Sequence, residues 1–150
     1  MVISALSRSK PRRYVLDANA LIGFLEDRAG TSSRVRRLLE EAFRHDLPLL
    51  LSAVNWGEVF YVSWRQHGEA NARQAESKLR HLPIAVIPVD IDRATRAAAL
   101  KQKHNLGYAD AFAAELALER GAWLVTADPE FSRMGKTLSL YPLPRHERKS

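Results

Sequence analysis

The 150-residue sequence contains no cysteine. This absence excludes a disulfide framework, a thiolate-bound zinc site and a cysteine nucleophile, and it is compatible with a reducing compartment. The sequence also lacks an apolar run near the roughly 20 residues that a membrane-spanning helix needs. Its first residues, MVISALSRSKPRR, run from apolar to basic, which is the reverse of a secretory signal. We therefore expect a cytoplasmic protein.

Acidic residues are in the minority, since 23 Lys and Arg face 17 Asp and Glu, for a formal net charge of +6. A basic chain favours an anionic partner, first of all nucleic acid, although solubility alone is the alternative explanation. The hydrophobic content of 46% excludes wholesale disorder, and the length fits one domain with an ordinary core.

Short apolar runs of strand type alternate with helical patterns along the chain. The strands are expected at residues 14–16, 47–51, 84–89, 122–126 and 138–141. This alternation predicts an α/β domain around a mostly parallel sheet of about five strands. The predicted organisation is a basic N-terminal arm at 1–13, one domain at 14–141 and a charged C-terminal tail at 142–150.

Four acidic residues stand out in this basic chain. Asp17 and Asp128 follow predicted strands, whereas Glu58 and Asp110 lie in helices that are largely apolar. Ligands of parallel sheets collect at the carboxyl ends of the strands. Each aspartate has a structural alternative, because Asp17 and Asp110 suit helix capping and Asp128, before a proline, suits an Asx-turn.

Glu58 has the weaker structural alternative. Its helix carries almost no other charge, so a desolvated carboxylate there is unfavourable unless a cation or donor meets it. The alternative is a buried pair with an arginine. Asp110 is surrounded by small alanines, which leave room for a metal ion, its waters and a phosphate.

Four other acidic residues are left out of the predicted site because of their positions in the sequence. We expect Asp92 to cap a helix and Asp90 to end a strand in a turn. Glu115 lies about 140° around the helix from Asp110, by the roughly 100° per residue of an ideal helix, and Glu130 is a weaker candidate at the edge of the site. The five histidines fall mostly near helix ends, where interaction with the helix dipole is expected.

Together the four carboxylates predict a Mg²⁺ site facing a polyanion, because Mg²⁺ prefers carboxylates and water. Such an ion activates water and stabilises the attacking and leaving oxygens at a phosphodiester. The hypothesis from the residues is therefore a metal-dependent nuclease.

The segments VLDANALI, NWGEVFY, LGYADAFAAELA and LVTADPEF resemble the PIN-domain ribonucleases, and within them the VapC toxins of VapBC toxin–antitoxin pairs. The resemblance spans roughly residues 14–141. It implies a three-layer α/β/α fold and Mg²⁺- or Mn²⁺-dependent endonucleolytic cleavage of RNA. The residues matched to the family's catalytic acids are Asp17, Glu58, Asp110 and Asp128. Of these, Asp17 and Asp110 match the metal ligands, and Asn19 and Thr126 match supporting polar positions.

The resemblance also implies a homodimer and an antitoxin that occupies an apolar groove near the active site. The helices expected at 20–26, 32–45 and 53–66 are the candidates for its walls. Alternatives are an inactive nucleic-acid-binding or adaptor domain, and a stand-alone nuclease that processes RNA or acts on DNA.

Overall fold

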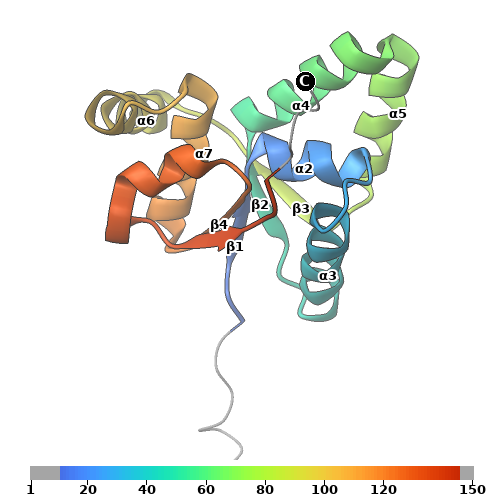
Figure 1. Cartoon of the computed structure of the whole chain (residues 1–150), viewed down its shortest axis with the longest axis horizontal. Helices are drawn as coiled ribbons and strands as arrows, with labels where there is room; N and C mark the ends of the chain where they lie inside the picture. The colour runs from blue at the N-terminus through green and yellow to red at the C-terminus, as the bar shows by residue number, and fades with distance from the viewer. Residues whose placement is uncertain (1–10, 146–150) are drawn as a thin grey trace, which may run out of the picture.

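The computed structural model describes residues 11–145 (Figure 1). Most of the predicted N-terminal arm and the last residues of the predicted tail lie outside the described residues. The strands are β1 (Tyr14–Leu16), β2 (Leu49–Ser52), β3 (Ile84–Ile87), β4 (Trp123–Thr126) and β5 (Leu140–Pro142). The helices are α2 (Ala18–Leu25), α3 (Thr31–Arg44), α4 (Ala53–His67), α5 (Glu69–Arg80), α6 (Ile91–His104), α7 (Tyr108–Arg120) and the 3₁₀ segment η1 (Pro129–Thr137).

The strands form one sheet in which every pair is parallel. Successive strand residues face opposite sides, as the two-residue period of a strand requires. In β1, Leu16 packs with the core under α2 and α3, whereas Val15 packs with the core under α6 and α7. Helices therefore cover both faces (Figure 1). The predicted three-layer α/β/α fold is confirmed, and the sheet is fully parallel.

The strand order is β3-β2-β1-β4-β5. The chain moves outward from β1 through β2 to β3, and then returns to place β4 on the other side of β1. The carboxyl ends of β1 and β4 are therefore adjacent where the direction of winding reverses, which is the usual place for a ligand site in an open parallel sheet. Asp17 directly follows β1 and Asp128 lies two residues after β4, so both residues lie at this edge of the sheet.

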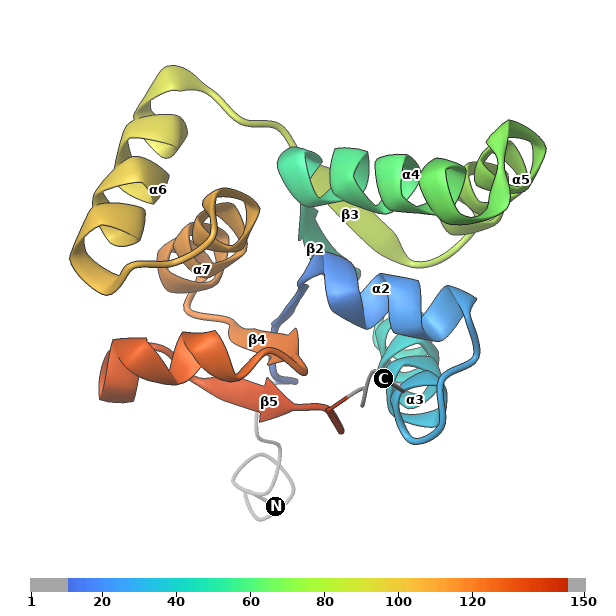
Figure 2. The ribbon, with the colours of Figure 1, turned by 45° about the horizontal axis from the view of Figure 1, so that its top comes forward.

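The helices α4 and α5 pack against each other beside this edge of the sheet (Figure 2). Trp56, Phe60 and Trp64 are three large aromatic side chains on the single helix α4. In the structure, the guanidinium of Arg73 lies over Phe60 and Trp64, and that of Arg80 lies over Trp56. The arginines of α5 thus cover part of these rings by cation–π contact.

One capping prediction is wrong in detail. Asp90, and not Asp92, caps α6, because its Oδ1 accepts a hydrogen bond from the Arg93 amide at 2.8 Å. The α3 helix starts at Thr31 after Gly30, whose φ of 78° suits glycine, and no side chain caps it. No helix within residues 11–145 is long and apolar enough to cross a bilayer.

Candidate functional site

Asp17 is fixed between β1 and α2. It is the N-cap of α2, and its Oδ1 accepts a hydrogen bond from the Ala20 amide at 2.7 Å. Its Oδ2 accepts a second bond from the Thr126 hydroxyl at the end of β4. Only 1% of Asp17 is exposed. Capping and a site role are therefore compatible, because the cap holds the carboxylate at the carboxyl end of the sheet.

Thr126 links the two neighbouring strands. Its hydroxyl donates to Asp17 and accepts a hydrogen bond from the Asp128 amide at 2.9 Å. Asp128 in turn accepts from the Glu130 amide at 2.9 Å, which is the expected Asx-turn. The predicted supporting position of Thr126 thus lies beside both aspartates.

Asp110 lies in the first turn of α7 and is half-buried. The preceding Gly107 is the N-cap of this helix, and a Cβ at Gly107 would lie 2.8 Å from Asp110 Oδ2. A side chain at position 107 would therefore displace the Asp110 carboxylate. The absence of that side chain gives the carboxylate its place at the positive end of the helix dipole.

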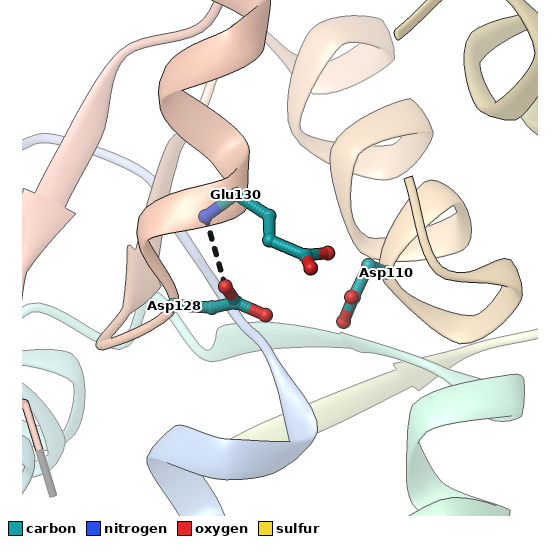
Figure 3. Close-up of side chains that lie close together, drawn as sticks. All are labelled: Asp110, Asp128 and Glu130. Atoms are coloured by element: carbon teal, nitrogen blue, oxygen red, sulfur yellow. Dashed lines mark hydrogen bonds between the residues drawn. The ribbon is translucent and has the colours of Figure 1, made fainter. Parts of the chain in front are cut away.

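Three carboxylates converge across the end of the sheet. Oxygens of Asp110, Asp128 and Glu130 lie within 4.8 Å of one another, and their side chains point toward a shared space (Figure 3). Sequence reasoning had set Glu130 aside. A local signal could have indicated it. Asp128 forms an Asx-turn with the Glu130 amide at the start of η1, and this turn holds Glu130 next to Asp128.

Glu58 projects from α4, which packs against α7. It is half-buried, and its charge is close enough to raise the pKa of Asp110. The predicted alternative of an arginine partner is absent: within residues 11–145, no ion pair with Lys, Arg or His is recorded for Asp17, Glu58, Asp110 or Asp128.

The acids raise one another's proton affinity. Burial raises the pKa of Asp17 to about 7, against the opposing hydrogen bonds from Thr126 and Ala20, and the charges of Asp110 and Asp128 add to the rise. Burial and the charges of Asp128, Glu58 and Glu130 raise the pKa of Asp110 to about 6. Burial also raises the pKa of Glu58, which hydrogen bonding with Asn55 partly offsets.

This donor set fits a hard divalent cation. Carboxylate oxygens are the preferred protein ligands of Mg²⁺ and Mn²⁺. Clustered and partly buried carboxylates without a cationic partner are stabilised by either protons or a metal ion. Asp110, predicted as a ligand, belongs to the converging trio, whereas Asp17 lies outside it. The direct ligation of Asp17 therefore stays a prediction.

The supporting role of Asn19 also stays a prediction. It lies in the first turn of α2, two residues after Asp17, and its side chain is exposed. By contrast, the exclusion of Glu115 agrees with the structure. This residue is only 2% exposed, and it pairs with Arg93 at 2.9 Å and Arg96 at 3.0 Å on the outer side of α7.

A groove of about 680 Å³, lined by both apolar and polar side chains, runs between α2, α4 and α5. Its walls include Ile22, Leu25, Val59, Val62 and Ala75. Two of the predicted walls, α2 and α4, line this groove. The third, at residues 32–45, does not, and residues of α5 line the groove beside α2 and α4.

The family model of the PIN domain matches residues 14–137. No curated protein sequence matches the chain. Among solved structures, VapBC2 from Rickettsia felis bound to a DNA fragment from its promoter is similar with a TM-score of 0.68 and 15% identity, over 87% of this chain and 98% of that chain.

Two further solved structures have the same fold. VapC20 of Mycobacterium tuberculosis, described as a sarcin–ricin loop cleaving toxin, aligns with a TM-score of 0.65 and 16% identity, over 81% of this chain and 95% of that chain. A toxin–antitoxin complex from Klebsiella pneumoniae aligns with a TM-score of 0.58 and 23% identity, over 83% of this chain and 94% of that one.

Proposed function

The chain belongs to the PIN-domain family, and on this basis we propose that it is a metal-dependent endoribonuclease, acting as the toxin of a toxin–antitoxin pair. The observation that carries the proposal is a group of five acids near the switch point of the sheet. Within residues 11–145, four of them have no ion pair with Lys, Arg or His, and the fifth, Glu130, lies 4.0 Å from Arg133. These acids are Asp17, Glu58, Asp110, Asp128 and Glu130.

In this proposal, Asp110, Asp128 and Glu130 would hold a divalent cation, and Asp17, predicted from the sequence as a ligand, would complete its shell directly or through water. The cation supplies positive charge that favours ionisation of water and offsets the charge of a phosphodiester. Thr126 keeps Asp17 oriented through its hydroxyl. Glu58, with its raised pKa, is placed to accept a proton as water attacks phosphorus and the P–O bond breaks.

RNA is the proposed substrate. The family resemblance supports it, as does the similarity of the fold to a toxin described as cleaving the sarcin–ricin loop. The net charge of +6 supports a polyanionic substrate of either kind. The charge does not separate RNA from DNA, so the substrate has to be decided by experiment.

The test is cleavage of matched single-stranded RNA and DNA oligonucleotides with Mg²⁺ or Mn²⁺, and again in EDTA. We expect metal-dependent cleavage of RNA alone. Undiminished cleavage in EDTA contradicts the mechanism. Cleavage of DNA alone supports the DNA-acting nuclease, and binding of RNA without any cleavage supports the adaptor.

The groove between α2, α4 and α5 is the proposed seat of the antitoxin. Its apolar walls suit an amphipathic segment, and Glu26 and Lys78 at its margin offer charges of both signs. The similar structures that contain toxin–antitoxin complexes support such a partner. We also propose a homodimer and a cytoplasmic setting, from the same resemblance.

The partner is tested with the product of the neighbouring upstream reading frame. Co-expression with this protein is expected to yield a stable complex that blocks RNA cleavage. Val62→Arg, which places a charge in the groove, is expected to release the partner and leave cleavage intact. Absence of a small neighbouring gene favours a stand-alone nuclease. Light scattering of the purified protein measures the proposed dimer.

A further inference from the structure

Asn55 is a buried amide that no step of the proposed reaction uses. It is 0% exposed, and it is one of only two buried residues of α4. Its Nδ2 donates a hydrogen bond to the carbonyl oxygen of Ala109 at 3.1 Å. That bond ties α4 to the first turn of α7 across 54 residues of sequence. A buried side-chain amide in this position needs an explanation beyond packing.

The bond ends next to two of the acids. Ala109 directly precedes Asp110, and Asn55 lies three residues before Glu58, so Asn55 and Glu58 share a face of α4. The Asn55 amide also lowers the pKa of Glu58 against the larger effect of burial, as a donor beside that carboxylate does. An amide nitrogen has two hydrogens, so Nδ2 is able to serve both the carbonyl of Ala109 and the carboxylate of Glu58.

The orientation of the amide follows from these partners. A carbonyl and a carboxylate both require a donor, which places Nδ2 toward them. The Oδ1 atom is then the only side-chain atom within residues 11–145 that is recorded as buried without a hydrogen-bond partner. Such orphaned acceptors are rare.

We propose that Asn55 is the positioning residue that holds Glu58 of α4 against Asp110 of α7, and that it thereby sets the spacing of the carboxylates around a divalent cation. Its part in catalysis rests on the proposed nuclease function, whereas its part in joining the two helices does not. A purely structural role predicts lost stability alone, while positioning predicts lost affinity for the cation as well.

The test measures Mn²⁺ affinity by calorimetry on the purified full-length protein. Asn55→Leu keeps the branching at Cγ but removes the amide, and we expect the affinity to fall about 10–100-fold, as is typical when an orienting partner of a metal ligand is lost. Asn55→Asp keeps the shape without the donor and is expected to fall as well. Asn55→Gln keeps the amide and is expected to recover part of the affinity.

Val35→Ala is the matched control. Val35 is also 0% exposed, but it lies in α3 under the opposite part of the core. We expect this variant to lose stability in urea unfolding with unchanged Mn²⁺ affinity. Wild-type affinity in folded Asn55→Leu and Asn55→Asp overturns the proposal, and so does an equal loss of affinity in Val35→Ala.

A second measurement needs no metal. Hydrogen exchange in EDTA is expected to speed up at the amides of residues 108–111 in Asn55→Leu and not in Val35→Ala. If the wild type binds no Mn²⁺, the proposed function fails, and the exchange experiment alone decides whether Asn55 joins α4 to α7. Unchanged exchange at these amides overturns the inference.

Discussion

The two ends of α7 bury acidic residues in opposite ways. Near the end of the helix, Glu115 meets Arg93 and Arg96, and Glu119 meets Arg93 at 2.9 Å and Arg120 at 3.0 Å. In the first turn, Asp110 faces Asp128 and Glu130. The helix α7 therefore contributes both to a neutralised set of acids and, through Asp110, to a set that repel one another.

The pKa values of the two sets of acids shift in opposite directions. Hydrogen bonding from Arg93 lowers the pKa of Glu119, whereas burial and neighbouring acids raise the pKa of Asp110 to about 6. Burial alone does not separate the two sets, because Glu115 is more buried than Asp110. The distinguishing property is that Asp110, unlike Glu115, has no ion pair with Lys or Arg within residues 11–145. A carboxylate with a raised pKa and no such partner is a candidate for binding a cation.

The largest expected effect is on catalysis. Asp110→Asn keeps the shape of the side chain but removes its charge, and we expect the rate of RNA cleavage to fall by roughly 10³-fold. The fold is expected to persist, because the substitution relieves repulsion from Asp128 and Glu130. Initial rates with Mg²⁺ and circular dichroism measure the two effects. A variant that cleaves at the wild-type rate removes Asp110 from the proposed site.

The next effect is the pH dependence of stability without metal. The pKa of Asp17 is higher in the folded chain, at about 7, than its ordinary value of 3.8, so the folded state binds this proton more tightly. Stability is therefore greatest in acid and is lost as pH rises toward that pKa. Between about pH 5 and about pH 8, the loss due to Asp17 is about 3 kcal/mol, at 1.36 kcal/mol per pH unit up to the folded pKa.

Urea unfolding in EDTA measures this loss, and Asp17→Asn is the control. Other groups titrate in both proteins, so the comparison is the difference between wild type and variant at each pH. We expect the variant to be the more stable protein at about pH 8, and the advantage to shrink at about pH 5. A constant difference across this range contradicts the burial of an unpaired charge at Asp17.

At the other end of α7, Glu115→Gln is expected to act on stability alone. It leaves Arg93 buried with less charge compensation, and we expect a loss of roughly 2–3 kcal/mol in the free energy of unfolding, below the full cost of breaking a buried pair because Arg96 is half exposed. Cleavage per folded molecule is expected to stay unchanged. Glu119→Gln, at a more exposed acid, is the milder control, with less than about 1 kcal/mol.

The smallest effect is expected at Glu130. Glu130→Gln removes one of three converging charges from a partly exposed position, so we expect Mn²⁺ affinity to fall about 5-fold, or about 1 kcal/mol, the order of a single charge interaction at 4 Å in water. Asp92→Asn, an exposed acid of α6, is the control and is expected to leave the affinity unchanged. Equal affinities in wild type and Glu130→Gln restrict the site to the other acids.

Several features followed from local sequence. The alternation of strands and helices predicted the parallel α/β sheet. Asp17 and Asp128 were recognised because a parallel sheet brings the ends of its strands to one edge. Their capping and turn roles were predicted as alternatives, and the structure shows both geometries at once.

Other features were not predicted from the sequence. Asp90 rather than Asp92 caps α6 because only the backbone path at the end of β3 decides which carboxylate reaches the Arg93 amide. Glu130 joins the acids through the turn after β4, and Asn55 reaches Ala109 across 54 residues. The cap at Asp90 and the turn at Asp128 are local, whereas the approach of Asn55 to Ala109 depends on how α4 and α7 pack and is not specified by spacing along the chain.

The sequence by itself determined the fold class and the candidate acids of the site, because hydrophobic periodicity and strand-end carboxylates are local properties. Only the tertiary structure decided which acids meet a partner. Glu115 and Asp110 lie on one apolar helix, and their surroundings differ because α6 brings arginines to one end while β4 and η1 bring carboxylates to the other. Packing decides these neighbours, and so it distinguishes Glu115, which is paired with arginines, from Asp110, which is proposed to bind a cation.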